Sequence, residues 1–266
     1  RRECCNGVKG DIKMKVIILA GGLPSTIEAD EKIPKPMAEI GERPILWHIM
    51  KYYASFGLTD FIICGGYKVD IIKEYFMNYY IHQSDITVDL ETNQVIIHKK
   101  ETENWKVSVV DTGIHANVSE RIRRVKDYVG NDAFIVAYGD CVHNIDLNKM
   151  ISQHKTDEKK ATMAVARPSG RNQIWPITIK GFRPGVSLDE IKEDAWANAC
   201  CMIFNPDAFE YIEQHASLEH SLFHLGNENL LSTYCHEGFW MPMETIRDRD
   251  ILNTMWNCGD APWKTW

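Results

Sequence analysis

Three groups of residues have the types and positions that phosphate chemistry needs. Gly21 and Gly22 follow the apolar segment 16–19, and glycines there let the backbone offer its N–H groups to a base or a phosphate. A strand followed by two glycines can also be a simple tight turn. Lys35, in Pro34-Lys35-Pro36-Met37, adds a positive charge close by in sequence. Asp140 ends another apolar segment, where open α/β sheets bind ligands.

The position of Asp140 favours a metal ligand. Magnesium prefers one or two carboxylates together with phosphate oxygens, so a second acid is expected to converge from elsewhere in the chain. Glu244, in Met241-Pro-Met-Glu-Thr245 before the last predicted helix, is the candidate. The alternative for Glu244 is an acid stabilised by the dipole at a helix N-terminus.

The spacing of apolar residues predicts alternating strands and helices in the first half of the chain. Short unbroken apolar segments, typical of buried parallel strands, lie at 16–19, 61–64 and 133–137, and a further strand is predicted at 107–110. Apolar residues three and four apart predict helices at 44–56 and 69–76, and a basic helix is expected near 121–129. The stretch 79–106 could form a small hairpin. This order predicts an α/β fold with a Rossmann-like, doubly wound, mostly parallel sheet.

The second half of the chain is expected to extend the same sheet as a sugar-binding half. Strands are predicted at 161–166, 177–179 and 199–204, and helices at 206–214, 218–225 and 244–256. We interpret residues 14–266 as one domain and residues 1–13 as a leader or upstream sequence.

Composition narrows the function classes. The 266 residues carry a net charge of −7, and the lysines and arginines are scattered, which argues against a nucleic-acid partner. No apolar run reaches the ~20 residues of a membrane helix, so we expect no membrane partner and a cytoplasmic location. The eight cysteines include no C-x-x-C pair, which favours reduced thiols.

Taken together, the motifs resemble those of the glucose-1-phosphate cytidylyltransferases, which belong to the sugar-phosphate nucleotidyltransferases. The resemblance runs from residue 14 to residue 266. It is carried by LAGG, PKPMAEIGERPILWHIMKYY, GLTDFIICGGYK, IKEYFMNYY, VVDTG, YGD, GFWMPMETIRDRD and GDAPWKTW.

The resemblance implies metal-dependent transfer of a cytidylyl group from CTP to a sugar 1-phosphate or another phosphorylated acceptor, with Mg²⁺ as cofactor. Lys35 and Asp140 match catalytic residues, Asp140 matches a metal ligand, and Glu244 stands where the family has an aspartate. By analogy, we also expect a homo-oligomer. The nucleotide-pocket segments carry Leu19, Gly21, Gly22, Asp111, Gly113, Arg121, Gly139 and Asn198.

The chain departs from the family in its phosphate- and sugar-facing motifs. The family loop G-G-x-G-T-R is one residue shorter here and has no arginine, and proline replaces a glycine. Family motifs E-K-P, N-G-G and T-G-G-R are replaced by residues 187–190, 198–200 and 118–121. Lys192 could replace the missing lysine, and Arg171 or Arg183 the missing arginine.

Two hypotheses follow. The first is an active cytidylyltransferase whose pocket has been reshaped for another acceptor, which the retained Lys35 and Asp140 favour. The second is a catalytically impaired homologue that binds nucleotide, or acts as a regulatory or assembly subunit, which the clustered losses favour. An NAD-binding protein is disfavoured because the first βα turn lacks G-x-G-x-x-G.

Overall fold

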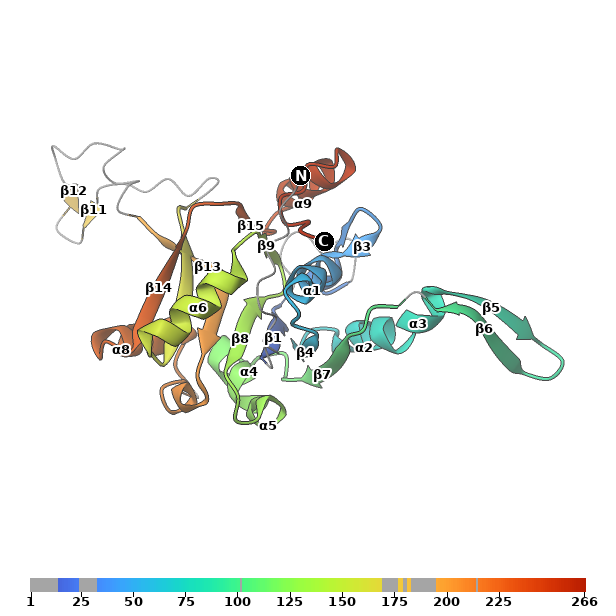
Figure 1. Cartoon of the computed structure of the whole chain (residues 1–266), viewed down its shortest axis with the longest axis horizontal. Coiled ribbons are helices and arrows are strands. Elements are labelled where there is room, and N and C mark those ends of the chain that lie inside the picture. The colour runs from blue at the N-terminus through green and yellow to red at the C-terminus, as the bar shows by residue number, and fades with distance from the viewer. Residues whose placement is uncertain are drawn as a thin grey trace, which may run out of the picture.

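The computed structural model describes residues 14–23, 33–100, 102–168, 177–178, 181–182, 195–213 and 215–266. Its central sheet consists of β1 (Lys15–Ala20), β4 (Asp60–Gly65), β7 (Lys106–Asp111), β8 (Phe134–Tyr138), β10 (Ala161–Ala166), β13 (Ala197–Phe204) and β14 (Leu231–His236). The strand order is β14-β10-β13-β8-β1-β4-β7 (Figure 1). β13 runs antiparallel to both of its neighbours, whereas the other pairs are parallel. The predicted Rossmann-like, mostly parallel sheet is confirmed.

Helices and short hairpins surround this sheet. The α-helices are α1 (Ile45–Ser55), α2 (Val69–Met77), α3 (Tyr79–His82), α4 (Val118–Arg124), α5 (Lys126–Val129), α6 (Leu147–Asp157), α8 (Leu218–Asn227) and α9 (Ile246–Asn257), and the 3-10 helices are η1 (Lys35–Met37) and η2 (Pro206–Glu210). The paired short strands are β2 (Glu39–Ile40) with β3 (Arg43–Pro44), β5 (Ser84–Asp89) with β6 (Gln94–Lys100), β9 (Cys141–His143) with β15 (Trp240–Pro242), and β11 (Ile177–Thr178) with β12 (Gly181–Phe182).

Both faces of the sheet are buried, which is why its strands are almost continuously apolar. Along β1, Val16 and Ile18 face one apolar cluster and Ile17 faces the other. α1 and α6 contribute to the first cluster, and α4 and α8 contribute to the second. The sheet is therefore covered on both sides, as in a doubly wound fold.

The structure changes three of the predicted elements. Residues 177 and 178 pair with β12 in a separate two-stranded sheet and do not extend the main sheet, and residue 179 lies outside the described residues. The segment predicted as a helix from 206 is the short 3-10 helix η2. The last helix begins at Ile246 because the Thr245 hydroxyl caps it, so Glu244 lies before the helix.

Within the described residues, no helix is long and apolar enough to cross a membrane.

The C-terminal tryptophans pack against a buried histidine of α1. His48 is fully buried, and its Nε2 donates a hydrogen bond to the Ile40 carbonyl (2.8 Å). The Trp263 indole donates to Nδ1 of the same ring (3.4 Å), and Trp256 contacts the ring edge-on. These contacts fix the neutral imidazole and hold the C-terminal segment on α1. Burial lowers the pKa of His48 to about 4.

His48 should make the protein less stable in mild acid. The unfolded chain takes up a proton near pH 6.5, whereas the folded His48 stays neutral until about pH 4. The contribution of His48 to the free energy of unfolding is therefore present above pH 6.5. It is lost as the pH falls towards 4, at about 1.4 kcal/mol per pH unit. Urea unfolding of the wild type and of His48→Gln at pH 7 and pH 5 measures this difference. The free energy of unfolding should depend less on pH in His48→Gln than in the wild type. The exposed control His220→Gln should keep the wild-type pH dependence.

Candidate active site

The carboxyl ends of β1, β4, β7 and β8 lie along one edge of the sheet, because these neighbouring strands run parallel. Gly21 and Gly22 follow β1, Gly113 lies just beyond β7, and Gly139 and Asp140 follow β8. Because β13 is antiparallel to β8, its first residues, including Asn198, lie at this same edge. The topology thus brings the separate sequence candidates to one side of the sheet.

Lys35 and Asp140 form an ion pair at this edge. The Lys35 Nζ lies 2.7 Å from an Asp140 carboxylate oxygen, and the two side chains are 19% and 28% exposed. A partly exposed pair of this kind contributes little to stability, on the order of 0 to 1 kcal/mol. Its charges therefore remain available to an incoming phosphate or cation.

The backbone around this pair is tightly packed. Pro36 and Met37 of η1 are buried, which anchors the lysine between them and Pro34. The Gly139 N–H donates to the Leu19 carbonyl (2.9 Å), and a Cβ on Gly139 would lie only 2.8 Å from that oxygen. Glycine is therefore needed at position 139, and the Leu19 carbonyl positions the turn that carries Asp140.

Glu244 is brought towards Asp140 by the β9–β15 ladder. Cys141 pairs with Pro242, and the Met243 N–H donates to the Asp140 carbonyl (2.8 Å). The cap of α9 is a reciprocal pair between Thr245 and Asp248, and Glu244 is exposed outside that helix. Asp248, and not Glu244, is thus the acid that caps the N-terminus of α9.

No cluster of three or more His, Cys, Asp or Glu side chains that could hold a metal occurs among the described residues.

Arg121 holds the loops that follow three strands. Its side chain is 5% exposed and extends from α4. Nη2 donates to the Gly21 carbonyl (2.7 Å), and Nη1 donates to the carbonyls of Gly65 (3.1 Å) and Gly113 (2.9 Å) and to the Thr112 hydroxyl (2.8 Å). Burial lowers the pKa of this guanidinium from its ordinary value. The observed contacts of Arg121 position the loops at this edge, and its assignment to the nucleotide pocket stays a prediction.

Asp111 and Gly113 form one of these loops. The Asp111 carboxylate accepts a hydrogen bond from the Gly113 N–H (2.9 Å), and Gly113 has a φ of +84°, which favours glycine.

Gly22 is exposed, and a Cβ there would meet no atom within 4 Å. A Cβ on Gly21, in contrast, would collide with the Arg121 guanidinium.

Asn198 and Cys200 form a bulge on β13. Met163 of β10 pairs with Met202 and Val165 pairs with Asn198, so three residues of β13 lie opposite one residue of β10. The Asn198 side-chain oxygen accepts the Cys200 N–H (2.9 Å), and Cys200 has a φ of +63°. This backbone conformation suits the glycine that the resembling family has there, and it costs a non-glycine residue about 1 kcal/mol.

Two further residues of the site were not singled out from the sequence. Thr112 is fully buried, and its hydroxyl donates to the Gly65 carbonyl (2.5 Å). Gly66 lies so close to the Gly21 carbonyl and Arg121 that a Cβ there would come within 2.6 Å of that oxygen. The double glycine at the end of β4, Gly65-Gly66, was the available signal for Gly66. The residues that depart from the family at 24–26 and 187–190, together with Arg171, Arg183 and Lys192, lie outside the described residues.

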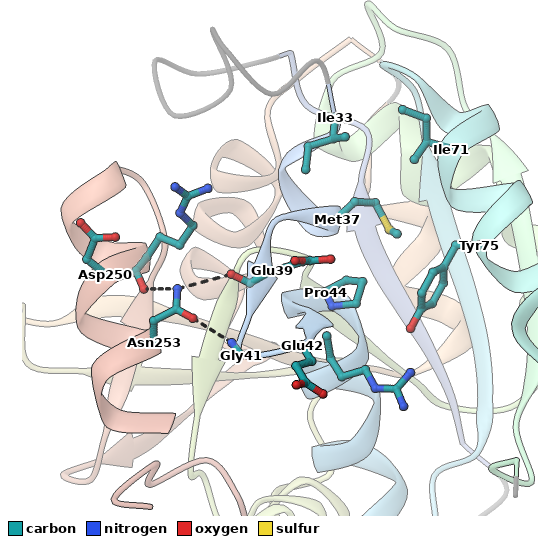
Figure 2. A pocket seen from close by; sticks show the side chains of 12 residues that line it. Ile33, Met37, Glu39, Gly41, Glu42, Pro44, Ile71, Tyr75, Asp250 and Asn253 are labelled. Atoms are coloured by element: carbon teal, nitrogen blue, oxygen red, sulfur yellow. Dashed lines mark hydrogen bonds between the residues drawn. The ribbon is translucent and has the colours of Figure 1, made fainter. Parts of the chain in front are cut away.

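A separate cavity of about 680 Å³ lies between η1, the β2–β3 hairpin, α2 and α9 (Figure 2). Asn253 of α9 spans one wall, where its side chain accepts the Gly41 N–H (2.8 Å) (Figure 2). Glu39, Glu42 and Asp250 line this cavity, and Lys35 and Asp140 do not. Arg43 and Arg249 also line the cavity, so the charge of its lining alone does not decide against an anion. The strand ends, which carry the Lys35–Asp140 ion pair beside glycine turns, remain the better site for phosphate chemistry.

Comparison with known proteins identifies the family. A family model described as nucleotidyl transferase matches residues 15–173. The glucose-1-phosphate cytidylyltransferase of Salmonella typhimurium is 42% identical over 258 residues, which cover 95% of this chain and all of that protein. The Salmonella typhi protein of the same name has the same identity and coverage.

A solved structure extends the similarity to the fold. The UDP-glucose pyrophosphorylase from Acinetobacter baumanii superposes with a TM-score of 0.68 at 15% identity, covering 92% of this chain and 94% of that one. The likeness to this structure concerns the fold, whereas the two Salmonella proteins match in sequence along their whole length. The chain therefore belongs to the nucleotidyl transferase family and, within it, to the glucose-1-phosphate cytidylyltransferases.

Proposed function

We propose that this chain transfers the cytidylyl group of CTP to a sugar 1-phosphate and releases pyrophosphate. The observation that carries the proposal is the Lys35–Asp140 ion pair of 2.7 Å at the carboxyl ends of β1 and β8. It lies in a chain that is 42% identical, over 95% of its length, to a glucose-1-phosphate cytidylyltransferase. Lysine and aspartate at a glycine-rich strand edge suit a polyphosphate and its counterion.

In this reaction an oxygen of the sugar phosphate attacks the α-phosphorus of CTP, and the bond from that phosphorus to the pyrophosphate oxygen breaks. Little covalent chemistry is asked of the protein, so positioning and positive charge supply most of the catalysis. We assign to the Lys35 ammonium the stabilisation of negative charge on the reacting phosphate. The nucleotide lies against the loops that carry Gly21, Gly22, Asp111 and Gly113.

We assign a divalent cation, Mg²⁺, to Asp140 and Glu244. The β9–β15 ladder and the Met243–Asp140 backbone hydrogen bond place the segments of these two acids next to each other. Two carboxylates are the kind of oxygen ligand that Mg²⁺ takes alongside substrate phosphates, which supports the assignment. The cation supplies charge neutralisation for the leaving pyrophosphate. The Lys35 ammonium pairs with the same Asp140 carboxylate.

Cys200 gives weight to the alternative of a catalytically impaired homologue. The left-handed backbone at Cys200 matches a glycine position, and a thiol in its place occupies room beside Asn198. The same replacement also suits an active enzyme with another acceptor. Asn198 and Cys200 are therefore the residues on which acceptor choice depends in this proposal.

Pyrophosphate release with CTP and Mg²⁺ tests the proposal. Glucose 1-phosphate is compared with a panel of other sugar phosphates and phosphonates. Release that depends on one acceptor and disappears in Lys35→Ala is the expected result. A folded protein that releases no pyrophosphate with any acceptor would favour the impaired homologue.

We further propose that the protein is a homo-oligomer and that the β5–β6 hairpin takes part in its contacts. The hairpin projects from the body of the molecule beyond α3 (Figure 1). One of its faces carries the cross-strand pairs Ile86–Ile97 and Val88–Val95, whose side chains are 39% to 55% exposed. A lone two-stranded hairpin is marginally stable in water, so burial of this face against another copy would stabilise it.

Charge placed on the apolar face should break this assembly. Val95→Lys is expected to lower the mass measured by light scattering after size exclusion, because it would bury a charge between copies. Ile96→Lys is a matched control, since Ile96 is adjacent and similarly exposed, at 53%, but points to the opposite face. A monomeric wild type, or equal effects of the two variants, would refute the assigned face.

A further inference from the structure

Two adjacent tyrosines of α1 hold β9, the short strand that follows Asp140. The Tyr53 hydroxyl and Nε2 of His143 are joined by a hydrogen bond of 3.2 Å. The Tyr52 hydroxyl donates to the Ile145 carbonyl. Both tyrosine rings meet the His143 ring edge-on, with centroids 4.7 Å away for Tyr52 and 5.9 Å away for Tyr53, and all three side chains are buried. The C-terminal half of α1 therefore contacts β9 and the residues just after it through two hydrogen bonds.

The N-terminal end of α1 is attached to the segment that carries Lys35. Lys35 begins η1, and Ala38 caps the C-terminal end of η1. The Ala38 carbonyl accepts the N–H of Ile45, the first residue of α1 (2.8 Å). One helix thus connects the segments of both partners in the Lys35–Asp140 ion pair, whose charged atoms lie 2.7 Å apart.

The position of β9 also affects the segment of Glu244. β15 pairs with β9 along its whole length. At one end of this ladder the Met243 N–H donates to the Asp140 carbonyl (2.8 Å), and at the other the Asn144 N–H donates to the Phe239 carbonyl (3.0 Å). Because Glu244 directly follows the ladder, its place relative to Asp140 depends on where α1 holds β9.

An imidazole is not the side chain that would stabilise position 143 most. Nδ1 of His143 is buried and has no hydrogen-bond partner among the described residues. A buried polar atom without a partner destabilises a fold, and an apolar side chain of similar volume would avoid this loss. A hydrogen bond, however, fixes distance and direction in a way that apolar packing does not. The Tyr53–His143 contact therefore suits the placement of β9 better than it suits stability.

We propose that Tyr53 and His143 are positioning residues of the transfer reaction. Their hydrogen bond sets the position of β9 on α1, and thereby the position of Asp140 relative to Lys35 and Glu244. This inference rests on the proposed function. Displacement of a reacting group by about 1 Å costs on the order of 100-fold in rate, so a loosened β9 is expected to lower kcat.

A double-mutant cycle tests this role. Tyr53→Phe, His143→Leu and the double variant keep the core apolar and close to its present volume. Each single change leaves a buried polar group without its partner, whereas the double variant leaves neither, so its urea midpoint should lie at or above those of the single variants. All three variants should lose at least about tenfold in kcat for pyrophosphate release, with the KM for CTP little changed. A double variant with a lower urea midpoint than either single variant would assign the pair to stability and overturn the proposal.

The matched control is a second buried histidine that bonds to a hydroxyl. Nδ1 of His154, on α6, is joined to the Thr162 hydroxyl by a hydrogen bond of 2.8 Å, and both side chains are buried. Thr162 lies at the amino end of β10, at the edge of the sheet opposite to Asp140. His154→Leu combined with Thr162→Val should therefore keep the wild-type kcat in the folded protein.

Hydrogen exchange follows the ladder without reference to activity. The Asn144 and Met243 amides should exchange faster in the double variant Tyr53→Phe/His143→Leu than in the wild type, and the amides of β1 should be unaffected. Unchanged exchange at these two amides overturns the proposal, and so does faster exchange with an unchanged kcat. A wild type that releases no pyrophosphate would refute the proposed function instead, and the exchange rates alone would then decide whether the pair holds β9.

Discussion

Replacing Asp140 with asparagine should lower the rate of pyrophosphate release by about 100- to 1000-fold. The change keeps the size of the side chain and removes the charge that pairs with Lys35 and is assigned to the cation. Loss of one preorganised electrostatic contact at a reacting centre costs about 3 to 4 kcal/mol of transition-state stabilisation, and each 1.4 kcal/mol is tenfold in rate. The effect is expected in kcat, because the contact strengthens as charge develops.

The fold should survive this replacement. The pair is partly exposed, so its loss is expected to change the free energy of unfolding by less than about 1 kcal/mol. Asp207→Asn is the matched control, because Asp207 forms an ion pair of 2.5 Å with Lys160, away from the candidate site. Steady-state kinetics and urea unfolding of both variants separate the roles. Equal activity of Asp140→Asn and the wild type would remove Asp140 from the mechanism.

The buried strands were predictable because they lie inside the sheet and are apolar on both faces. β1, β4 and β8 each appear in the sequence as an unbroken apolar segment, and all three lie inside the sheet. β7 lies at one edge of the sheet and was predicted although Ser108 interrupts its apolar residues. β14, at the other edge of the sheet, has only two buried positions out of six, and no pattern singled it out. α6 escaped prediction for a similar reason, since its polar residues outnumber its apolar ones.

The candidate site was predictable where a residue type is tied to a strand end. Asp140 and Gly139 follow a buried strand, and the structure places them beside Lys35. The approach of Glu244 towards Asp140 depends on the β9–β15 ladder, which pairs segments about 100 residues apart and leaves no local pattern. The contacts of Arg121 were not predictable either. A sequence motif identifies an arginine but does not reveal which carbonyls its guanidinium binds.

Arg121 links the stability of the fold to the shape of the candidate nucleotide pocket. Its guanidinium is the shared donor for the loops after β1, β4 and β7. Arg121→Met retains most of the side-chain volume and removes every donor. The carbonyls of Gly21 and Gly113 would then lose their partner, and a buried unsatisfied polar group costs about 1 to 3 kcal/mol. We expect Arg121→Met to lower the free energy of unfolding by about 3 kcal/mol or more.

The kinetic consequence should distinguish positioning from stability alone. With the loops released, the KM for CTP should rise at least about tenfold at a temperature where the variant remains folded. Arg123→Met is the matched control on the same helix, since Arg123 is exposed and donates to the Phe209 and Ile212 carbonyls away from these loops. That variant should lose about 1 kcal/mol or less and keep its KM. A destabilised Arg121→Met with an unchanged KM for CTP would show that the loops hold their shape without the guanidinium, and would confine Arg121 to the stability of the fold.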